Sequence, residues 1–320
     1  MTHPIPSGTR DVLPDEMREL RAISERLRAV FDEAGYGEVY TPALEYDAEI
    51  ERADLAGARP AYRLFDEHGN VLVLRSDMTV PIARVVATRY AHSEPPMRFC
   101  YLAHAYRGVR PQRGQAREFL QAGIELIGSP APQGTAEALG VLCRALDAAG
   151  LRDYRVGLGD ASLYGALLDA FGVPAGPRQR ILHALVARDF VGLEHEVAAV
   201  GLGEQEAALL LRVPQMRGGA DVLDATDGPV ADALAGMRAV RELLDPAASE
   251  RVIFDLGLVR DLGYYTGGVF EVYDPALGVP IGGGGRYDDL LGRFGRELPA
   301  VGFALDLERL HLALTGEERT

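Results

Sequence analysis

Two apolar segments that lie close together in the sequence constrain the fold of this chain most. Residues 97–106 and 119–127 are predominantly apolar and are predicted to be strands. The polar loop between them, residues 107–117, contains Arg107, Arg110, Arg113 and Arg117. A short polar connection between two such strands is typical of an antiparallel pair, so these residues predict an antiparallel sheet.

Hydrophobic periodicity predicts further elements along the chain. In residues 15–31, apolar side chains recur at spacings of three and four, as on one face of a helix. Residues 61–75 alternate around His68-Gly69-Asn70, which predicts a β-hairpin. The same reasoning predicts helices at 80–90, 135–149 and 306–314, and strands at 39–44, 252–259, 268–273 and 300–303.

A change of pattern marks a separate segment of the chain. Residues 162–244 are almost entirely helical in pattern and rich in Ala and Leu, and strands resume directly after them. We therefore expect a helical insertion at 162–244 in a core formed by 1–161 and 245–320. The predicted fold class is α+β: an antiparallel sheet with helices packed on one side, interrupted by the insertion.

Charge and cysteine content narrow the classes of function. Acidic residues outnumber basic ones by 47 to 33, and the formal net charge of −14 does not favour RNA binding, which usually needs a basic face. Cys100 and Cys143 have no paired spacing, so neither a disulfide framework nor a zinc site is suggested, and we expect no metal and no cofactor. The sequence shows no signal-peptide pattern or membrane-length apolar run, and the cytoplasm is the expected location.

The strand after the basic loop suggests a binding site. Gln121, Gly123 and Glu125 occupy alternate positions and therefore share one face of that strand. The face carries an amide, a gap and a carboxylate beside arginines, whose guanidinium groups suit carboxylate or phosphate oxygens. A buried carboxylate needs a partner, which a cationic or hydrogen-bonding ligand group would supply. The alternative interpretation is a solvated hairpin loop without a ligand.

Two glycine-rich segments could complete such a site. Tyr264 and Tyr265 lie beside glycines and offer hydroxyls and flat faces to a ligand, although a hairpin with both rings in the core is the alternative. Residues 282–285 are consecutive glycines followed by Arg286. They could form a phosphate-binding loop before a helix at 286–294, but their spacing matches neither the P-loop nor the dinucleotide fingerprint.

Taken in order, these elements resemble the catalytic core of histidyl-tRNA synthetase, a class II aminoacyl-tRNA synthetase. The segments similar to its N-terminal signature and to class II motifs 1, 2 and 3 are 7–14 (SGTRDVLP), 35–45 (GYGEVYTPALE), 106–128 and 301–310 (VGFALDLERL). The segments similar to its two histidine-specific motifs are 260–271 (RDLGYYTGGVFE) and 282–290 (GGGGRYDDL). The resemblance covers nearly the whole chain and implies a homodimer formed through motif 1.

The resemblance also implies a histidine-binding site. By position, Asp77 and Thr79 would hold the α-amino group of histidine, with Asp77 in place of a glutamate. Gln121 would lie near the backbone atoms of the bound amino acid. These residues are expected to bind one end of the ligand.

The residues around the imidazole and the carboxylate of histidine are assigned in the same way. Glu125 and Tyr265 would read the imidazole, with Tyr264 beside them. Arg107 and Arg260 would face the carboxylate and, during adenylation, the α-phosphate. The chemistry agrees with this assignment, because an imidazole has two nitrogens that a carboxylate and a phenol can both satisfy.

The nucleotide half of the implied site departs from the synthetase pattern. Val109 replaces a glutamate that helps to hold adenine, and Gln115 replaces a basic residue. Asp306 replaces a glycine near the nucleotide and would bring negative charge close to a triphosphate; like charges at ~4–5 Å repel by a few kcal/mol at intermediate dielectric. Asp261 and Gly263 exchange the usual Gly and Asp. The sequence ends at Thr320, and we expect the anticodon-binding domain to be absent.

An amino-acid site without a nucleotide site suggests a sensor, and the combination resembles the family of regulatory subunits of ATP phosphoribosyltransferase. This resemblance implies a non-catalytic chain that activates a short-form catalytic subunit in a hetero-octamer, in the first step of histidine biosynthesis, and allows feedback inhibition by histidine. One alternative is an active truncated histidyl-tRNA synthetase or another histidine-activating ligase, which Arg107 and Arg260 favour. The other is a partner-binding scaffold without a ligand.

Overall fold

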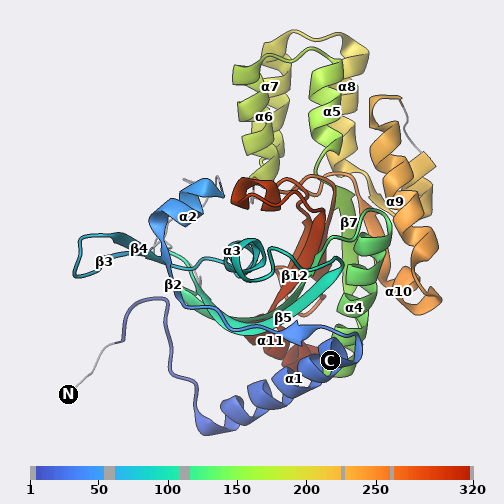
Figure 1. Ribbon diagram of the computed structural model, residues 1–320. Helices are drawn as coiled ribbons and strands as arrows, with labels where there is room; N and C mark the ends of the chain where they lie inside the picture. The colour runs from blue at the N-terminus through green and yellow to red at the C-terminus, as the bar shows by residue number, and fades with distance from the viewer. Residues whose placement is uncertain (1–4, 54–61, 109–115, 225–227, 260–262, 318–320) are drawn as a thin grey trace.

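The computed structural model describes residues 5–53, 62–108, 116–224, 228–259 and 263–317, and a strongly curved sheet runs through it (Figure 1). Neighbouring strands of this main sheet are antiparallel apart from the parallel pairs β1–β5 and β7–β9. The strand order is β1 (Gly37–Glu38), β5 (Met97–Tyr106), β6 (Glu118–Ile127), β12 (Ala300–Asp306), β11 (Gly282–Arg286), β10 (Gly268–Tyr273), β7 (Arg155–Asp160), β9 (Val252–Asp255) and β8 (Arg217–Gly218).

The two apolar segments at 97–106 and 119–127 form neighbouring strands, as predicted. β5 and β6 are antiparallel, and their register runs from Met97 opposite Ile127 to Tyr106 opposite Glu118. Side chains of β6 alternate between the two faces of the sheet: Ile124 and Leu126 belong to the large core, whereas Ile127 belongs to a second, smaller core. Gln121, Gly123 and Glu125 therefore share the face that carries the smaller core.

Helices cover the face of the sheet that carries the large core, which we call the helix face. α1 (Pro14–Glu33), α4 (Gln133–Ala149) and α11 (Leu307–Glu317) pack together there (Figure 1). α1 begins at a proline, which suits the first turn of a helix, and buries Leu27 and Phe31 along its apolar stripe. The predicted helices at 15–31, 135–149 and 306–314 are thus confirmed, with small shifts at their ends.

The opposite face, which we call the site face, carries a helix that the prediction of one-sided packing did not include. α3 (Thr79–Arg89) lies in the hollow of the sheet (Figure 1). Its Ile82 and Val86 are buried in the smaller core, to which Phe99 of β5 also belongs. The 3₁₀ segment Leu291–Phe294 packs on α3. Because α3 is apolar on most of its surface, it has to be covered on more than one side.

A small second sheet stands beside α3. It has the order β2 (Leu44–Tyr46), β4 (Val71–Leu74) and β3 (Arg63–Phe65), and α2 (Asp47–Arg52) follows β2. The predicted hairpin is confirmed as β3–β4: Asp66 Oδ1 accepts hydrogen bonds from the backbone nitrogens of His68 and Asn70, and Gly69 has a φ of +82°.

The predicted strand at 39–44 is wrong for most of its length. β1 ends at Glu38 and β2 begins at Leu44, so the residues between them cross from the main sheet to the small one. Pro42 has no N–H to donate to a sheet. The guanidinium of Arg75 instead donates to the carbonyl oxygens of Thr41 at 2.7 Å and Pro42 at 3.2 Å, which satisfies this crossing backbone.

The glycine-rich segment 282–285 is not a loop before a helix. It forms β11, and the predicted helix at 286–294 is replaced by the 3₁₀ segment Leu291–Phe294. A Cβ on Gly284 would lie 2.0 Å from the carbonyl oxygen of Gly302 on the neighbouring strand. Glycine is therefore required by the close approach of β12 rather than by a phosphate.

Three other strands of the main sheet also differ from the predictions. β7 was not predicted, although Val156 and Leu158 alternate with glycines, and its glycines lower strand propensity. β9 ends at Asp255, four residues before the predicted end at 259. The strand at 268–273 is confirmed as β10, and the strand at 300–303 extends to Asp306 as β12.

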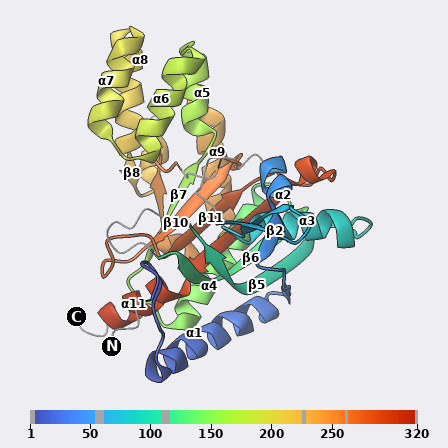
Figure 2. The same ribbon diagram turned by 90° about the vertical axis from the view of Figure 1, so that its left-hand side faces the viewer.

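The segment 162–244 is predominantly helical, as predicted, and its first helices project from one end of the sheet (Figures 1 and 2). The helices are α5 (Leu163–Ala170), α6 (Ala175–Val186), α7 (Phe190–Val200), α8 (Glu204–Arg212) and α9 (Ala231–Leu243), with 3₁₀ segments Val213–Gln215, Ala220–Asp224 and Gly228–Val230; α10 (Pro246–Arg251) follows. β8 pairs with β9, and α9 packs on α4 and β7. The proposed domain division at 162 and 244 therefore stays a prediction. Across the described parts of the chain, no helix is both long and apolar enough to cross a membrane.

Candidate functional site

A narrow pocket, here called the inner pocket, opens on the site face between β6, β12 and the start of α3. Its volume is about 40 Å³. Seven of the eight residues predicted to bind a ligand line it: Asp77, Thr79, Arg107, Gln121, Glu125, Tyr264 and Tyr265. The eighth, Arg260, lies outside the described residues, as do Val109 and Gln115. The predicted set is thus brought together from segments far apart in the sequence.

Glu125 lies at the centre of the inner pocket and is 1% exposed. Thr79 Oγ1 donates a hydrogen bond to Glu125 Oε1 at 2.7 Å, and the hydroxyl of Tyr287 donates to Glu125 Oε2. Burial raises the pKa of Glu125 to about 8; the two hydroxyls lower it, and the nearby carboxyl of Asp77 raises it. Glu125 is therefore mostly protonated at neutral pH while the pocket is empty.

Tyrosine rings form one wall of the inner pocket. The ring of Tyr264 lies 4.9 Å from that of Tyr265 and 5.7 Å from that of Tyr287, between centroids. Burial raises the pKa of Tyr264 and Tyr287 well above the usual value, so both keep their hydroxyl protons. The two interpretations of the tyrosine motif are compatible, because Tyr264 is 3% exposed and packs in the smaller core while it also lines the pocket.

The polar residues at the other wall are held by local structure. Asp77 Oδ1 accepts a hydrogen bond at 3.1 Å from the backbone nitrogen of Val80, the second residue of α3. The guanidinium of Arg107 stacks 4.4 Å above the ring of Phe119. Gln121 Oε1 is buried and accepts no hydrogen bond from the part of the chain that the structure describes. A buried acceptor of this kind is suited to a ligand that donates a hydrogen bond.

Two tyrosines of the pocket were missing from the predicted set, Tyr287 and Tyr101. Tyr287 follows Gly283 and Gly285 at alternate positions, and this alternation could have placed it on the site face once 282–285 was recognised as a strand. Tyr101 stands opposite Gly123 in the β5–β6 register, and a Cβ on Gly123 would lie 2.5 Å from its hydroxyl oxygen. The gap at Gly123 thus makes room for a tyrosine.

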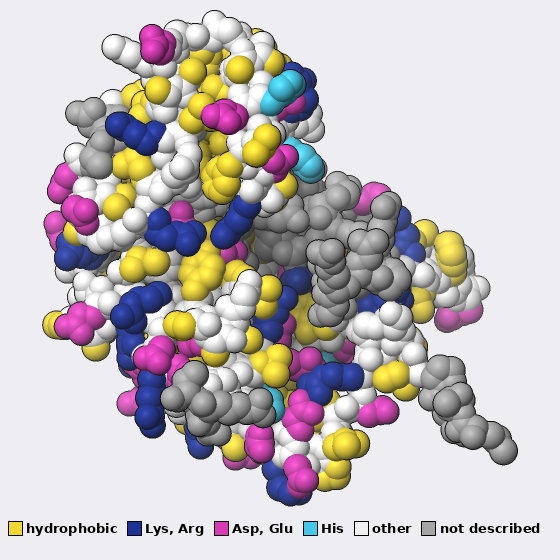
Figure 3. Space-filling view, turned by 180° about the vertical axis from the view of Figure 1, so that it is seen from behind, with side chains coloured by type: hydrophobic (Ala, Val, Ile, Leu, Met, Phe, Trp, Pro, Cys, Tyr) yellow, Lys and Arg dark blue, Asp and Glu magenta, His cyan; other side chains and the backbone are white. Residues whose placement is uncertain are grey.

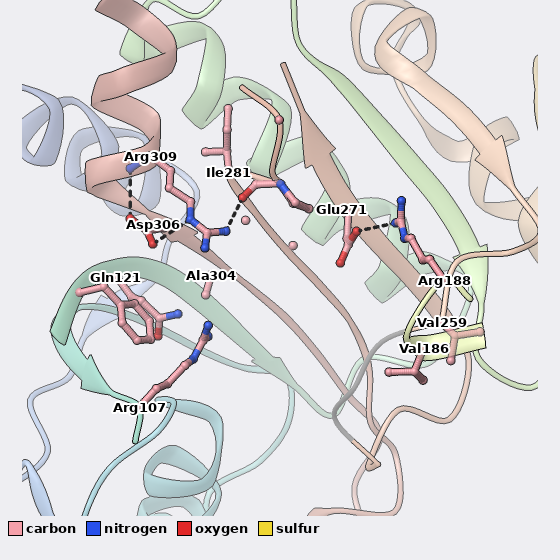
Figure 4. A pocket seen from close by; sticks show the side chains of 15 residues that line it. Arg107, Gln121, Val186, Arg188, Val259, Glu271, Ile281, Ala304, Asp306 and Arg309 are labelled. Atoms are coloured by element: carbon pink, nitrogen blue, oxygen red, sulfur yellow. Dashed lines mark hydrogen bonds and ion pairs between the residues drawn. The ribbon is translucent and has the colours of Figure 1, made fainter. Parts of the chain in front are cut away.

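A wider space, the outer pocket, continues from the inner one and has a volume of about 460 Å³ (Figure 4). Arg107, Gln121, Gly283 and Ala304 line both pockets. A water molecule needs about 10–15 Å³ measured in this way. A ligand of amino-acid size therefore has to extend into the outer pocket or displace a tyrosine ring.

Asp306 occupies the outer pocket together with Arg309 (Figure 4). Asp306 Oδ1 accepts hydrogen bonds from the backbone nitrogens of Glu308 and Arg309 at the start of α11, each at 3.1 Å. Asp306 Oδ2 lies 3.4 Å from Arg309 Nε, and Arg309 Nη1 donates to the carbonyl oxygen of Pro280 at 2.7 Å. Burial raises the pKa of Asp306, whereas Arg309 and Arg107 lower it. An anion in this pocket would have to compete with Asp306 for Arg309.

Charged side chains of both signs occur outside the two pockets. Figure 3 shows Arg side chains interspersed with Asp and Glu on one face of the molecule. Among the residues that the structure describes, there is no group of three or more His, Cys, Asp or Glu side chains placed to hold a metal ion.

Comparison with known proteins shows the family to which this fold belongs. The family model described as histidyl-tRNA synthetase matches residues 8–310. A protein of Symbiobacterium thermophilum named ATP phosphoribosyltransferase regulatory subunit is 43% identical over 316 residues, which cover 97% of this chain and 79% of the relative. A protein of the same name from Desulforamulus reducens is 39% identical over 313 residues, with coverages of 96% and 78%.

A solved structure from Bacillus halodurans, described as an ATP phosphoribosyltransferase regulatory subunit/histidyl-tRNA synthetase, superposes with a TM-score of 0.88 and 33% identity, over 98% of this chain and 84% of that one. The fold and the pocket thus define a histidyl-tRNA synthetase-like protein with a class II core, as the motifs predicted. Within that class, the chain belongs to the family of ATP phosphoribosyltransferase regulatory subunits.

The raised pKa of Glu125 predicts a pH-dependent contribution to stability. The unfolded chain releases this proton near pH 4.5 and the folded chain near pH 8, so the wild type loses stability between these values. Glu125→Gln removes the proton release and should gain roughly 3–5 kcal/mol relative to the wild type as the pH rises from 4.5 to 8. Urea unfolding of both proteins at several pH values measures the difference, and a difference that does not vary with pH would contradict the assignment.

Proposed function

We propose that this chain is the non-catalytic regulatory subunit of an ATP phosphoribosyltransferase and that it binds histidine. The observation that carries the proposal is the contrast between the two pockets. The inner pocket assembles the polar residues expected around an amino acid, whereas Asp306 engages Arg309 in the outer pocket, where the resemblance to a synthetase implies the nucleotide side of the site. A chain with this contrast can bind the amino acid without activating it.

The proposed ligand is supported by the groups around Glu125. One imidazole N–H can donate to a carboxyl oxygen of Glu125, and the other nitrogen can accept from the hydroxyl of Tyr265. The Thr79 hydroxyl gives its proton to Glu125, so its oxygen can accept a hydrogen bond from the α-ammonium group beside Asp77.

The remaining groups suit the rest of an amino acid. Gln121 Oε1 is a buried acceptor for the α-ammonium group. Arg107, and Arg260 if it lies as the resemblance implies, would bind the carboxylate of histidine. Tyr264 would support the ring of Tyr265. In this arrangement each polar end of histidine has a counterpart of the right chemistry.

The regulatory part of the proposal follows from linkage. Histidine can inhibit a partner enzyme only if its affinity differs between two arrangements of the complex. We propose that the chain works in the cytoplasm, that it activates a short-form catalytic subunit in a hetero-octamer, and that bound histidine favours the less active arrangement. The names of the relatives support the association with a phosphoribosyltransferase.

Histidine binding should depend on Glu125. Calorimetry should detect binding of histidine to the wild type, and Glu125→Ala should weaken it by at least about tenfold, because the buried imidazole N–H loses its acceptor. Glu118→Ala is a matched control, since Glu118 is exposed on the same strand, and should bind as the wild type does. If neither the free chain nor its complex binds histidine, the proposed ligand is wrong.

We also propose that the chain forms a homodimer through motif 1, and the small sheet supports this. Leu44 stands opposite Leu74, and Tyr46 and Leu64 both stand opposite Leu72, so these side chains share one face of that sheet. Leu44, Tyr46 and Leu64 are 44%, 54% and 43% exposed. A contiguous exposed apolar face is unfavourable in a monomer, and a second copy of the chain would cover it.

A charge on this face should therefore disrupt the dimer. Leu64→Lys should weaken dimerisation by at least about tenfold, because it places a charge in a buried apolar contact. Leu243→Lys, at a similarly exposed leucine on α9, should leave the dimer intact. Sedimentation velocity over a range of concentrations distinguishes the outcomes, and a Leu64→Lys protein that remains a wild-type dimer would rule out this face.

A further inference from the structure

β11 carries Tyr287 to Glu125, yet its first four residues have no side chains to fix the position of the strand. Residues 282–285 are all glycine, and β10 and β12 approach them closely. A Cβ on Gly282 would lie 2.3 Å from the carbonyl oxygen of Ala304, and one on Gly285 would lie 2.8 Å from Cδ1 of Tyr265. Glycine loses more conformational freedom on folding than any other residue. The first side chain that can anchor this strand is Arg286.

Arg286 reaches the helix face, on the opposite side of the sheet from Tyr287. Its side chain is buried, and its three nitrogens all have partners: Nε donates to Thr135 Oγ1 at 3.3 Å, Nη1 to Asp288 Oδ1 at 2.7 Å and Nη2 to the carbonyl oxygen of Ser129 at 2.9 Å. Ser129 and Thr135 flank the start of α4. The planar guanidinium thus ties the end of β11 to a helix on the far side of the sheet.

The backbone around Arg286 holds two tyrosines of the inner pocket. The carbonyl oxygen of Arg286 accepts a hydrogen bond from the backbone nitrogen of Thr266 at 2.8 Å, and Thr266 Oγ1 accepts one from the backbone nitrogen of Asp288 at 3.0 Å. Thr266 directly follows Tyr265. The next backbone nitrogen, that of Tyr287, donates to the carbonyl oxygen of Ala300 at 2.8 Å. The backbone segments that carry Tyr265 and Tyr287 are therefore joined by hydrogen bonds at Arg286 and its neighbours.

We propose that Arg286 is a positioning residue of the ligand site, which places the Tyr287 hydroxyl on Glu125 and, through Thr266, the ring of Tyr265. The effect on ligand affinity rests on the proposed histidine binding, whereas the placement of Tyr287 does not.

The Tyr287–Glu125 contact gives the proposal a direct readout. The titratable groups that line the inner pocket with Glu125 are Asp77, Arg107 and the tyrosines Tyr101, Tyr264, Tyr265 and Tyr287. The Tyr287 hydroxyl lowers the pKa of Glu125, so its displacement should raise that pKa. A change that only loosens the packing of α4 would leave this pKa where it is.

Arg286→Lys tests the proposal, because it keeps the charge and removes the planar group with three partners. In the full chain, ¹³C NMR titration of labelled glutamate, with Glu125 assigned from Glu125→Gln, should show the pKa of Glu125 raised, as it should in Tyr287→Phe. The affinity for histidine should fall about tenfold in calorimetry. If Arg286→Lys does not fold, Thr135→Val removes only the partner of Nε and should shift the pKa in the same direction by less.

Arg98→Lys is the matched control. Arg98 of β5 also reaches the helix face and binds α4, through two contacts with Glu137 at 2.8 and 2.9 Å, but it has no contact with the inner pocket. The Arg98→Lys substitution should lower the melting temperature and leave the pKa of Glu125 and the histidine affinity unchanged. The proposal is overturned if Arg286→Lys behaves like Arg98→Lys. If the wild type does not bind histidine, the proposed ligand fails, and the NMR titration still decides the role of Arg286.

Discussion

Glu125 accepts hydrogen bonds from Thr79 at the start of α3 and from Tyr287 after β11, so one buried carboxyl group joins three elements that are far apart in the sequence. A buried carboxyl without partners would cost several kcal/mol, and the surrounding structure provides them. Gly123 leaves room for Tyr101 beside Glu125, and the glycines of β11 allow the strand that carries Tyr287 to approach β12. The glycines that allow these strands to pack closely therefore also place the tyrosines that line the pocket.

The two ends of the site differ in how their charges are satisfied. At the inner end, two hydroxyls donate hydrogen bonds to the carboxyl group of Glu125, whose pKa is raised by burial. The buried amide oxygen of Gln121 accepts no hydrogen bond from the described residues and can accept one from a ligand. At the outer end, Asp306 caps α11 and pairs with Arg309, so a cationic group there is already engaged. An amino acid matches the first arrangement, whereas a triphosphate would have to displace the second. This contrast explains how a synthetase-like fold can serve as a regulatory subunit.

The sequence predicted which residues line the inner pocket better than it predicted the strands on which they lie. Seven of the residues predicted to bind a ligand lie together, because strand alternation and the order of the motifs are local features of the sequence. The four glycines misled the analysis, since a glycine run signals a loop unless a neighbouring strand is known to approach within 2.0 Å of a Cβ position. Tyr287 was missed for the same reason. Likewise, no local signal indicated that Arg75 satisfies the crossing at Thr41 and Pro42.

We propose that histidine regulates a phosphoribosyltransferase through the pocket around Glu125. The most direct measurement is the rate of a short-form catalytic subunit reconstituted with this chain, with and without histidine. The wild-type chain should raise the rate of the catalytic subunit, and histidine should lower it again. Glu125→Gln should still activate the partner but respond to histidine only at concentrations about tenfold higher or more. A catalytic rate indifferent to this chain, or equal inhibition of both complexes by histidine, would contradict the account.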